Sequence, residues 1–105
     1  MVNKHSIREF AEKIAARYSP EKIILFGSQA RGTETEESDV DLLVIMDFDG
    51  RSIRKASEIR SSIDYHFPLD LLVRRASDIS WRIQEGDYFL QDIMKEGVVL
   101  YEAAH

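Results

Sequence analysis

The spacing of apolar residues along the chain predicts helices that alternate with short strands. Apolar residues recur every three or four positions over residues 6–18 and again over residues 51–65, as on the buried face of an amphipathic helix. Four short apolar runs have the length and composition of strands: residues 22–26, 40–46, 69–73 and 98–101. We therefore expect an α/β fold with a short mixed β-sheet flanked by helices.

Capping residues give the expected ends of the helices. Ser6 is a good N-cap for the first helix, and the periodicity of the second helix places Ile53 on its buried face. Beyond the third strand, Ser77 and Asp87 can each cap a short helix, and Gly97 can end the second of these two helices. The chain is thus expected to end in two short helices and a brief closing strand.

Length and composition limit the classes of protein to consider. The chain has 105 residues, enough for one domain spanning 1–105 with a single core. Its net charge of -5 opposes direct binding of nucleic acid, and the absence of cysteine excludes disulfides and thiolate metal sites. No stretch approaches the roughly 18 apolar residues of a membrane span. We expect a soluble, cytoplasmic protein that binds neither membranes nor nucleic acid.

Aspartates interrupt two of the apolar runs. Asp39 and Asp41 flank Val40, and because strand side chains alternate between faces, both carboxylates should project from the same side. Such unpaired carboxylates repel each other and lose solvation beside apolar residues, unless a divalent cation neutralises them. Oxygen ligands without Cys or His favour Mg²⁺, with Mn²⁺ as a substitute. A third aspartate, Asp70, lies in the following strand.

A glycine turn at the end of the first strand supplies a second half of the predicted site. Gly27 has no Cβ and so lets a phosphate approach the backbone, while Ser28 offers a hydroxyl and an N–H at the start of a short helical turn. Arg31 follows one step later and can contact phosphate or pair with a nearby carboxylate. This turn is a suitable place for a triphosphate tail.

Structural alternatives exist for each motif. The glycine turn and the Asp-x-Asp pair could be a surface turn followed by capping or edge-strand aspartates, although acidic positions inside core strands then need another explanation. Asp70 alone could form an ion pair with Arg74 or Arg75. The first alternative predicts aspartates that cap helices or lie at a strand edge, and the second predicts an ion pair between Asp70 and Arg74 or Arg75.

The combined motifs resemble the nucleotidyltransferase superfamily that includes DNA polymerase β, and most closely its small "minimal" members. The resemblance covers nearly the whole chain and rests on four segments: GSQARG (27–32), SDVDLLV (38–44), LDL (69–71) and EGVVLYE (96–102). A lone Gly-Ser or Asp-x-Asp is a weak signal, whereas both at this spacing, followed by a strand aspartate, form a specific one. The resemblance implies a small polymerase-β-like nucleotidyltransferase domain.

The family's roles carry over to matching positions of this chain. The resemblance implies that Gly27 and Ser28 hold the β- and γ-phosphates of ATP, and that Asp39 and Asp41 bind the metal ions. Asp70 would complete the second of two metal sites and is the best candidate for the general base. Catalysis would then be nucleotide transfer to an acceptor hydroxyl.

The resemblance also implies a partner. Similar minimal nucleotidyltransferases act with a helical HEPN-domain protein as a toxin–antitoxin pair, which implies that this chain is an antitoxin in a hetero-oligomer, transferring AMP onto a tyrosine of the toxin. Two alternatives remain open: a non-catalytic module that masks the toxin, and a nucleotidyltransferase for a small-molecule acceptor. The last two helices carry Trp81, Tyr88 and Phe89 at spacings that leave at least one off the core face, where it can mark a partner surface.

Overall fold

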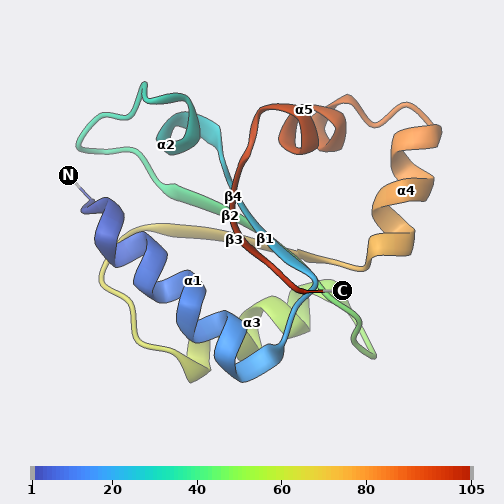
Figure 1. The fold of residues 1–105 in the computed structure, drawn as a ribbon, viewed down its shortest axis with the longest axis horizontal. Coiled ribbons are helices and arrows are strands. Elements are labelled where there is room, and N and C mark those ends of the chain that lie inside the picture. Colours follow the sequence, from blue (N-terminus) through green and yellow to red (C-terminus); the bar gives the residue numbers. More distant parts are fainter. Residues whose placement is uncertain (1, 105) are drawn as a thin grey trace.

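The fold is a four-stranded mixed sheet with helices on both faces. The structure is a computed structural model that describes residues 2–104, and none of the helices in that range is long and apolar enough to cross a membrane. The elements follow one another along the chain as shown in Figure 1: α1 (Lys4–Tyr18), β1 (Lys22–Phe26), α2 (Gly27–Arg31), β2 (Val40–Ile45), α3 (Ser52–Ser62), β3 (Leu69–Arg74), α4 (Ala76–Gln84), α5 (Tyr88–Glu96) and β4 (Val98–Glu102).

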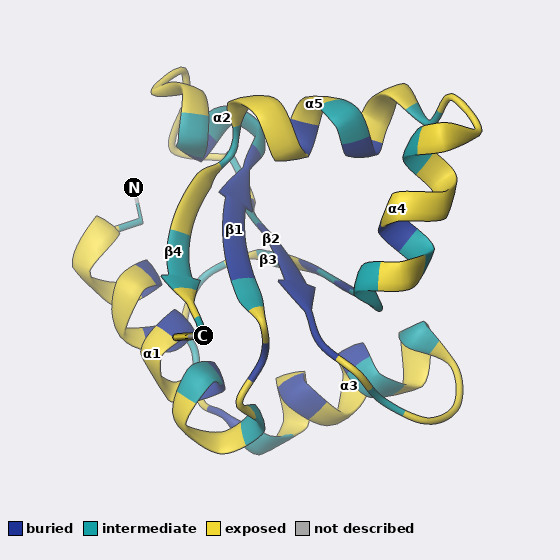
Figure 2. Ribbon diagram, turned by 45° about the vertical axis from the view of Figure 1, so that its right-hand side comes forward, coloured by how far each residue is buried: buried dark blue, intermediate teal, exposed yellow. Residues whose placement is uncertain are grey.

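The order of strands across the sheet is β3-β2-β1-β4. β1 pairs with β2 and with β4 in antiparallel fashion, whereas β2 and β3 are parallel and are connected through α3. The predicted mixed sheet is therefore confirmed. Figure 2 shows that the two central strands, β1 and β2, are the most deeply buried, while β3 and β4 form the two edges of the sheet.

Two apolar clusters cover the two faces of the sheet. Because strand side chains alternate, Ile23 of β1 joins the cluster beneath α1 and α3, whereas its neighbour Ile24 joins the cluster beneath α4 and α5. Figure 1 shows the same arrangement, with α1 and α3 on one side of the sheet and α4 and α5 on the other. The short helix α2 continues directly from β1 and contacts β2 and α5, so the glycine turn lies at the end of the central strand.

The first helix begins earlier than the sequence suggested. Asn3, not Ser6, is the N-cap, and its side-chain oxygen accepts a hydrogen bond from the backbone N–H of His5 at 2.8 Å. Ser6 lies inside the helix, where its N–H donates to the Asn3 carbonyl at 3.0 Å. Asparagine caps as well as serine does, so the earlier of two competent caps sets the helix start.

Two further expectations about helices were wrong, and two were confirmed. α4 is preceded by Arg75 without a side-chain cap, so Ser77 lies within the helix instead of capping it. Ile53, in the first turn of α3, is 75% exposed and does not pack into the core. Asp87 does cap α5 and accepts a hydrogen bond from the N–H of Leu90 at 3.0 Å, and Gly97 ends that helix.

Candidate active site

The register of the sheet brings two of the three aspartates together. In the parallel pairing of β2 with β3, Asp41 lies directly beside Asp70, and across the antiparallel pairing it faces Phe26, the last residue of β1. Asp41 is two positions before Leu43, which belongs to the cluster beneath α4 and α5, so the carboxylate projects from the same face of the sheet. Both carboxylates therefore lie on the α5 side of the sheet.

Asp39 stands at the entrance to β2. It precedes the strand by one residue and is exposed, so it does not have the fully extended strand position that the Asp-x-Asp spacing suggested. The charge of Asp39 nevertheless acts on the Asp41 carboxyl group, as does the charge of Asp70. That Asp39 and Asp41 project from the same side stays a prediction.

The pKa of Asp41 is raised above the ordinary aspartate value of 3.8. Burial of the carboxyl group is the main cause, and the neighbouring charges of Asp70 and Asp39 add to it, while Arg31 acts in the opposite direction. Asp70 has no compensating ion pair in residues 2–104: Arg74 donates to the Val73 carbonyl at 2.8 Å, and Arg75 pairs with Asp78 at 3.3 Å. The structure therefore does not support the expected alternative in which Asp70 only serves an ion pair.

Glycine is required at position 27 by the backbone conformation there and by the neighbouring Asp41 carboxylate. The φ of Gly27, +72°, lies in the left-handed region that side chains disfavour. A Cβ built on Gly27 would also overlap the Asp41 carboxylate. The glycine therefore lets the chain turn sharply out of β1 while leaving room for a carboxylate directly against the turn.

The remaining predicted residues of the turn have different surroundings. α2 starts at Gly27 with no side-chain cap, so no side chain occupies the N–H groups of its first turn. Arg31 lines the cavity beside Asp41 and Asp70 and, among residues 2–104, has no carboxylate within 4.0 Å. Ser28 is half-buried and does not line that cavity, and its carbonyl accepts from the N–H of Thr33 at 3.1 Å.

A cavity of about 360 Å³ joins the glycine turn, the two neighbouring aspartates and α5. Sequence reasoning did not place α5 at this site, where Phe89, Asp92 and Glu96 are among the residues that line the cavity from one side of the helix. Asp92 and Glu96 are four residues apart and hence on one helix face, but this spacing alone does not show that the face lies over the aspartates. Phe89 packs edge-on against Phe26, with ring centroids 5.8 Å apart.

The side chains of the cavity fit a hard divalent cation. Its charged residues are four carboxylates and one guanidinium group: Asp41, Asp70, Asp92, Glu96 and Arg31. Carboxylate oxygens are the ligands preferred by Mg²⁺ and Mn²⁺, and the raised pKa of Asp41 marks negative charge that a cation would relieve. Across the described chain, no three acidic or histidine side chains already stand at metal-binding distances from one another.

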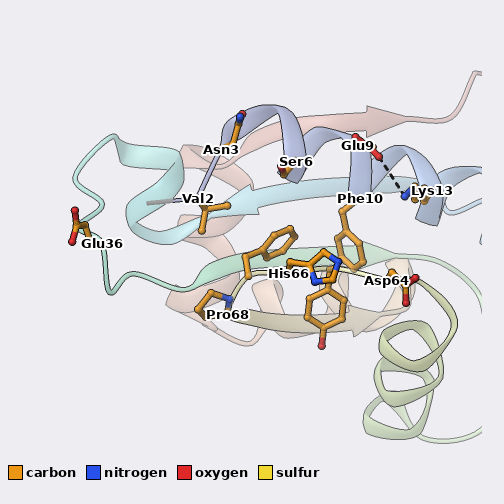
Figure 3. Close-up of a pocket in the computed structure, with 12 residues that line it drawn as sticks. Val2, Asn3, Ser6, Glu9, Phe10, Lys13, Glu36, Asp64, His66 and Pro68 are labelled. Atoms are coloured by element: carbon orange, nitrogen blue, oxygen red, sulfur yellow. Dashed lines mark ion pairs between the residues drawn. The ribbon is translucent and has the colours of Figure 1, made fainter.

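A larger cavity, of about 620 Å³, lies elsewhere in the molecule. Figure 3 shows it between α1 and the loop that precedes β3, with Phe10 and His66 among its lining residues and a Glu9–Lys13 ion pair of 3.3 Å at its rim. None of the predicted site residues lines it. We assign the candidate active site to the smaller cavity because only that cavity combines the glycine turn with converging carboxylates.

Comparison with known proteins agrees with this geometry. The family model described as "Nucleotidyltransferase domain" matches residues 7–100. A protein of Methanocaldococcus jannaschii named "Putative protein adenylyltransferase" is 32% identical over 103 residues, which cover 96% of this chain and 100% of that protein. A second protein from the same organism, with the same name, is 31% identical over 94 residues, or 88% of this chain and 92% of its own length.

Solved structures share the fold at lower identity. The crystal structure of a "putative nucleotidyltransferase" from Sulfolobus solfataricus has a TM-score of 0.65 and 20% identity, and the match covers 93% of this chain and 78% of that one. A structure described as a "toxin-antitoxin with AMP-PNP" has a TM-score of 0.56 and 21% identity over 97% of this chain and 75% of its own. These likenesses extend to nearly the whole sheet and its helices.

Proposed function

Because this chain belongs to the nucleotidyltransferase domain family, we propose that it transfers AMP from ATP to a tyrosine hydroxyl of a partner HEPN-domain toxin and so acts as an antitoxin. The observation that carries the proposal is the pairing of Asp41 with Asp70 directly beneath the Gly27 turn. The names of the relatives support a protein as acceptor, and the toxin–antitoxin neighbour supports a toxin as that protein.

Each residue of the site has a role in this proposal. Gly27 and Ser28 hold the β- and γ-phosphates, with Arg31 as a further phosphate contact, since it is a cation without a carboxylate partner in the described chain. Asp39, Asp41 and Asp70 would hold Mg²⁺ or Mn²⁺. When bound, two such ions neutralise the carboxylates and the triphosphate and lower the pKa of the acceptor hydroxyl.

The transfer step is balanced by groups of this chain and of the two substrates. The acceptor oxygen bonds to the α-phosphorus of ATP, the bond from that phosphorus to the β-phosphate bridging oxygen breaks, and pyrophosphate leaves. Asp70 takes the proton of the hydroxyl, because it is exposed at the mouth of the cavity and makes no ion pair with Arg74 or Arg75. Asp41, deeper and more crowded by charge, is suited to metal binding.

Intact-mass spectrometry tests the proposal directly. The chain is incubated with a HEPN-domain protein, ATP and Mg²⁺, and the expected result is a gain of one or more AMP units on the partner. The Asp39→Asn/Asp41→Asn variant is the control and should give no gain. If the wild-type chain binds ATP and yet leaves the partner's mass unchanged, protein nucleotidylation is wrong.

The second candidate function is a non-catalytic module that masks the toxin by binding it, and the exposed aromatic residues favour this candidate. Trp81, Tyr88 and Phe89 are 60%, 76% and 56% exposed, which is typical of a protein-binding surface. If masking alone neutralises the toxin, Asp70→Asn should neutralise it as well as the wild type does. Under the enzymatic proposal, the same variant loses neutralisation while it still binds the toxin.

A further inference from the structure

A groove of about 450 Å³ follows the outer edge of β3, between α3 and α4. Within residues 2–104, Asp70 is the one residue that lines both this groove and the active-site cavity. The groove therefore adjoins the candidate active site at the carboxylate that the proposed function assigns as general base. A chain that presents a hydroxyl at Asp70 can continue into the groove.

Arginine side chains cap two outward-facing carbonyls of β3 along this edge. The carbonyls of Pro68 and Arg74 accept hydrogen bonds from β2, so the alternate residues Leu69, Leu71 and Val73 direct their backbone groups outward. The side chain of Arg74 donates to the Val73 carbonyl at 2.8 Å, and Arg60 donates to the Leu69 carbonyl at 3.5 Å. These arginines thus hinder strand addition at the two carbonyls and present guanidinium groups to a ligand in the groove.

The groove has the opposite charge character to the active-site cavity. Its charged lining consists of three arginines and two aspartates: Arg60, Arg74, Arg82, Asp70 and Asp78. Asp78 is already paired with Arg75 at 3.3 Å, and no carboxylate in the described chain lies within 4.0 Å of Arg60 or Arg74. A protein of net charge -5 therefore keeps positive charge without a carboxylate partner beside the acidic active-site cavity.

We propose that this groove binds an extended, acidic segment of the acceptor protein, next to the residue that receives the nucleotide, and so positions that residue at Asp70. The inference rests on the proposed function and adds the chemistry of the acceptor. Charge complementarity with Arg60 and Arg74 selects acidic residues, and the exposed Ile53 at the rim adds an apolar contact. The groove has no aromatic lining on which bases could stack, which favours protein over single-stranded RNA as the occupant.

Fluorescence anisotropy with synthetic probes tests the groove. The first probe is a labelled peptide in which glutamate alternates with threonine around one tyrosine. The second has lysine in place of glutamate, and the third is a single-stranded RNA oligonucleotide. Each is titrated at low ionic strength with the wild-type chain, with Arg60→Glu and with Arg54→Glu. Arg54 is an exposed residue of the same helix that does not line the groove, so its variant makes the same change in charge outside it.

The proposal expects the glutamate peptide to bind the wild type and Arg54→Glu equally. Arg60→Glu should weaken this binding by about fivefold and improve binding of the lysine peptide, because an attraction becomes a repulsion. The proposal is overturned if the glutamate peptide does not bind, if Arg60→Glu leaves its affinity unchanged, or if RNA alone binds in a manner that depends on Arg60.

The assay contains neither ATP nor a divalent cation, so its result does not depend on nucleotide transfer. If the partner gains no AMP but the glutamate peptide still binds, the proposed function is wrong and the groove remains a site for acidic peptides. If the partner is nucleotidylated with the same KM by Arg60→Glu and by Arg54→Glu, the groove proposal alone is wrong.

Discussion

Gly27 and Gly32 share a backbone conformation and differ in what surrounds them. Their φ values are +72° and +76°, so alanine at either position costs about 1 kcal/mol of backbone strain. Only at Gly27 does the new methyl group meet the Asp41 carboxylate, while at Gly32 no atom lies within 4 Å. We expect both variants to lose similar backbone stability, with an additional loss in Gly27→Ala.

Activity separates the two variants further. Gly27→Ala displaces Asp41, and displacement of a catalytic group by about 1 Å can cost about 100-fold in rate. Gly32→Ala should keep most of its activity. Urea unfolding and the rate of AMP transfer by both variants check this prediction, and equal activity losses would contradict the assigned role of the Gly27 turn.

The partly buried Asp41 carboxylate lowers the stability of the folded protein when no metal ion is bound. Its pKa is raised, so the folded state holds the proton more tightly than the unfolded chain, and the stability that this confers is lost as pH rises through the folded-state pKa. At neutral pH without divalent cations, Asp41→Asn should therefore melt at a higher temperature than the wild type. The difference should disappear at acidic pH, where Asp41 is protonated.

The same substitution should reduce AMP transfer by about 100-fold or more, because it removes a metal-binding carboxylate. Thermal melts across pH and the transfer rate are measured on one preparation. A variant that is less stable than the wild type at neutral pH would show that the charge of Asp41 is satisfied by the fold.

At the scale of single elements, the N-cap of α5 stabilises the helix that forms one wall of the active-site cavity. Asp87 accepts from the N–H of Leu90 at 3.0 Å, and α5 carries Phe89, Asp92 and Glu96 into the cavity. Asp87→Ala should lower the free energy of unfolding by about 1 kcal/mol. Ser77→Ala is the matched control in the neighbouring helix, where no side-chain cap exists, and should change stability little. Urea unfolding distinguishes the two, and equal losses would contradict the assignment of the cap.

The strands were predictable almost to the residue because their apolar runs are bounded by turn residues such as Gly27, Asp47 and Pro68. The run 40–46 became β2, Val40–Ile45, and the run 69–73 became β3, Leu69–Arg74. Helix ends were less predictable because more than one residue near each end can act as a cap. Asn3 caps α1 in place of Ser6, and Ser77 does not cap α4. Periodicity also placed Ile53 in the core, although it is 75% exposed, because spacing alone does not show which apolar positions of a helix are covered by other elements.

The candidate site was predictable in its acidic and glycine positions and not in its walls. Gly27, Asp41 and Asp70 carry local signals, because glycine in a sharp turn and aspartate in an apolar strand both conflict with their surroundings. Asp92 and Glu96 sit on an ordinary amphipathic helix, so only the packing of α5 over β1 reveals that they face the cavity. The groove along β3 was likewise not predictable from the sequence, because its arginines come from three separate elements that only the tertiary structure brings together.

At the scale of the whole molecule, negative charge is concentrated where the nucleotide is proposed to bind, and this predicts cation-dependent stability. The chain has a net charge of -5, and four carboxylates share the active-site cavity with one arginine. A ligand that binds only the folded state raises stability by mass action, so Mg²⁺ should raise the melting temperature of the wild-type chain, and Mg²⁺ with ATP should raise it further.

Variants of equal charge separate specific binding from general screening. Asp41→Asn/Asp70→Asn removes two carboxylates from the cavity, whereas Glu12→Gln/Glu21→Gln removes two exposed carboxylates that do not line it. Screening of net charge would be reduced equally in both, because each variant carries the same net charge. A site in the cavity predicts that the Mg²⁺-induced shift persists in Glu12→Gln/Glu21→Gln and disappears in Asp41→Asn/Asp70→Asn. Equal shifts in the two variants would place cation binding outside the cavity and remove the basis for metal-assisted transfer at these aspartates.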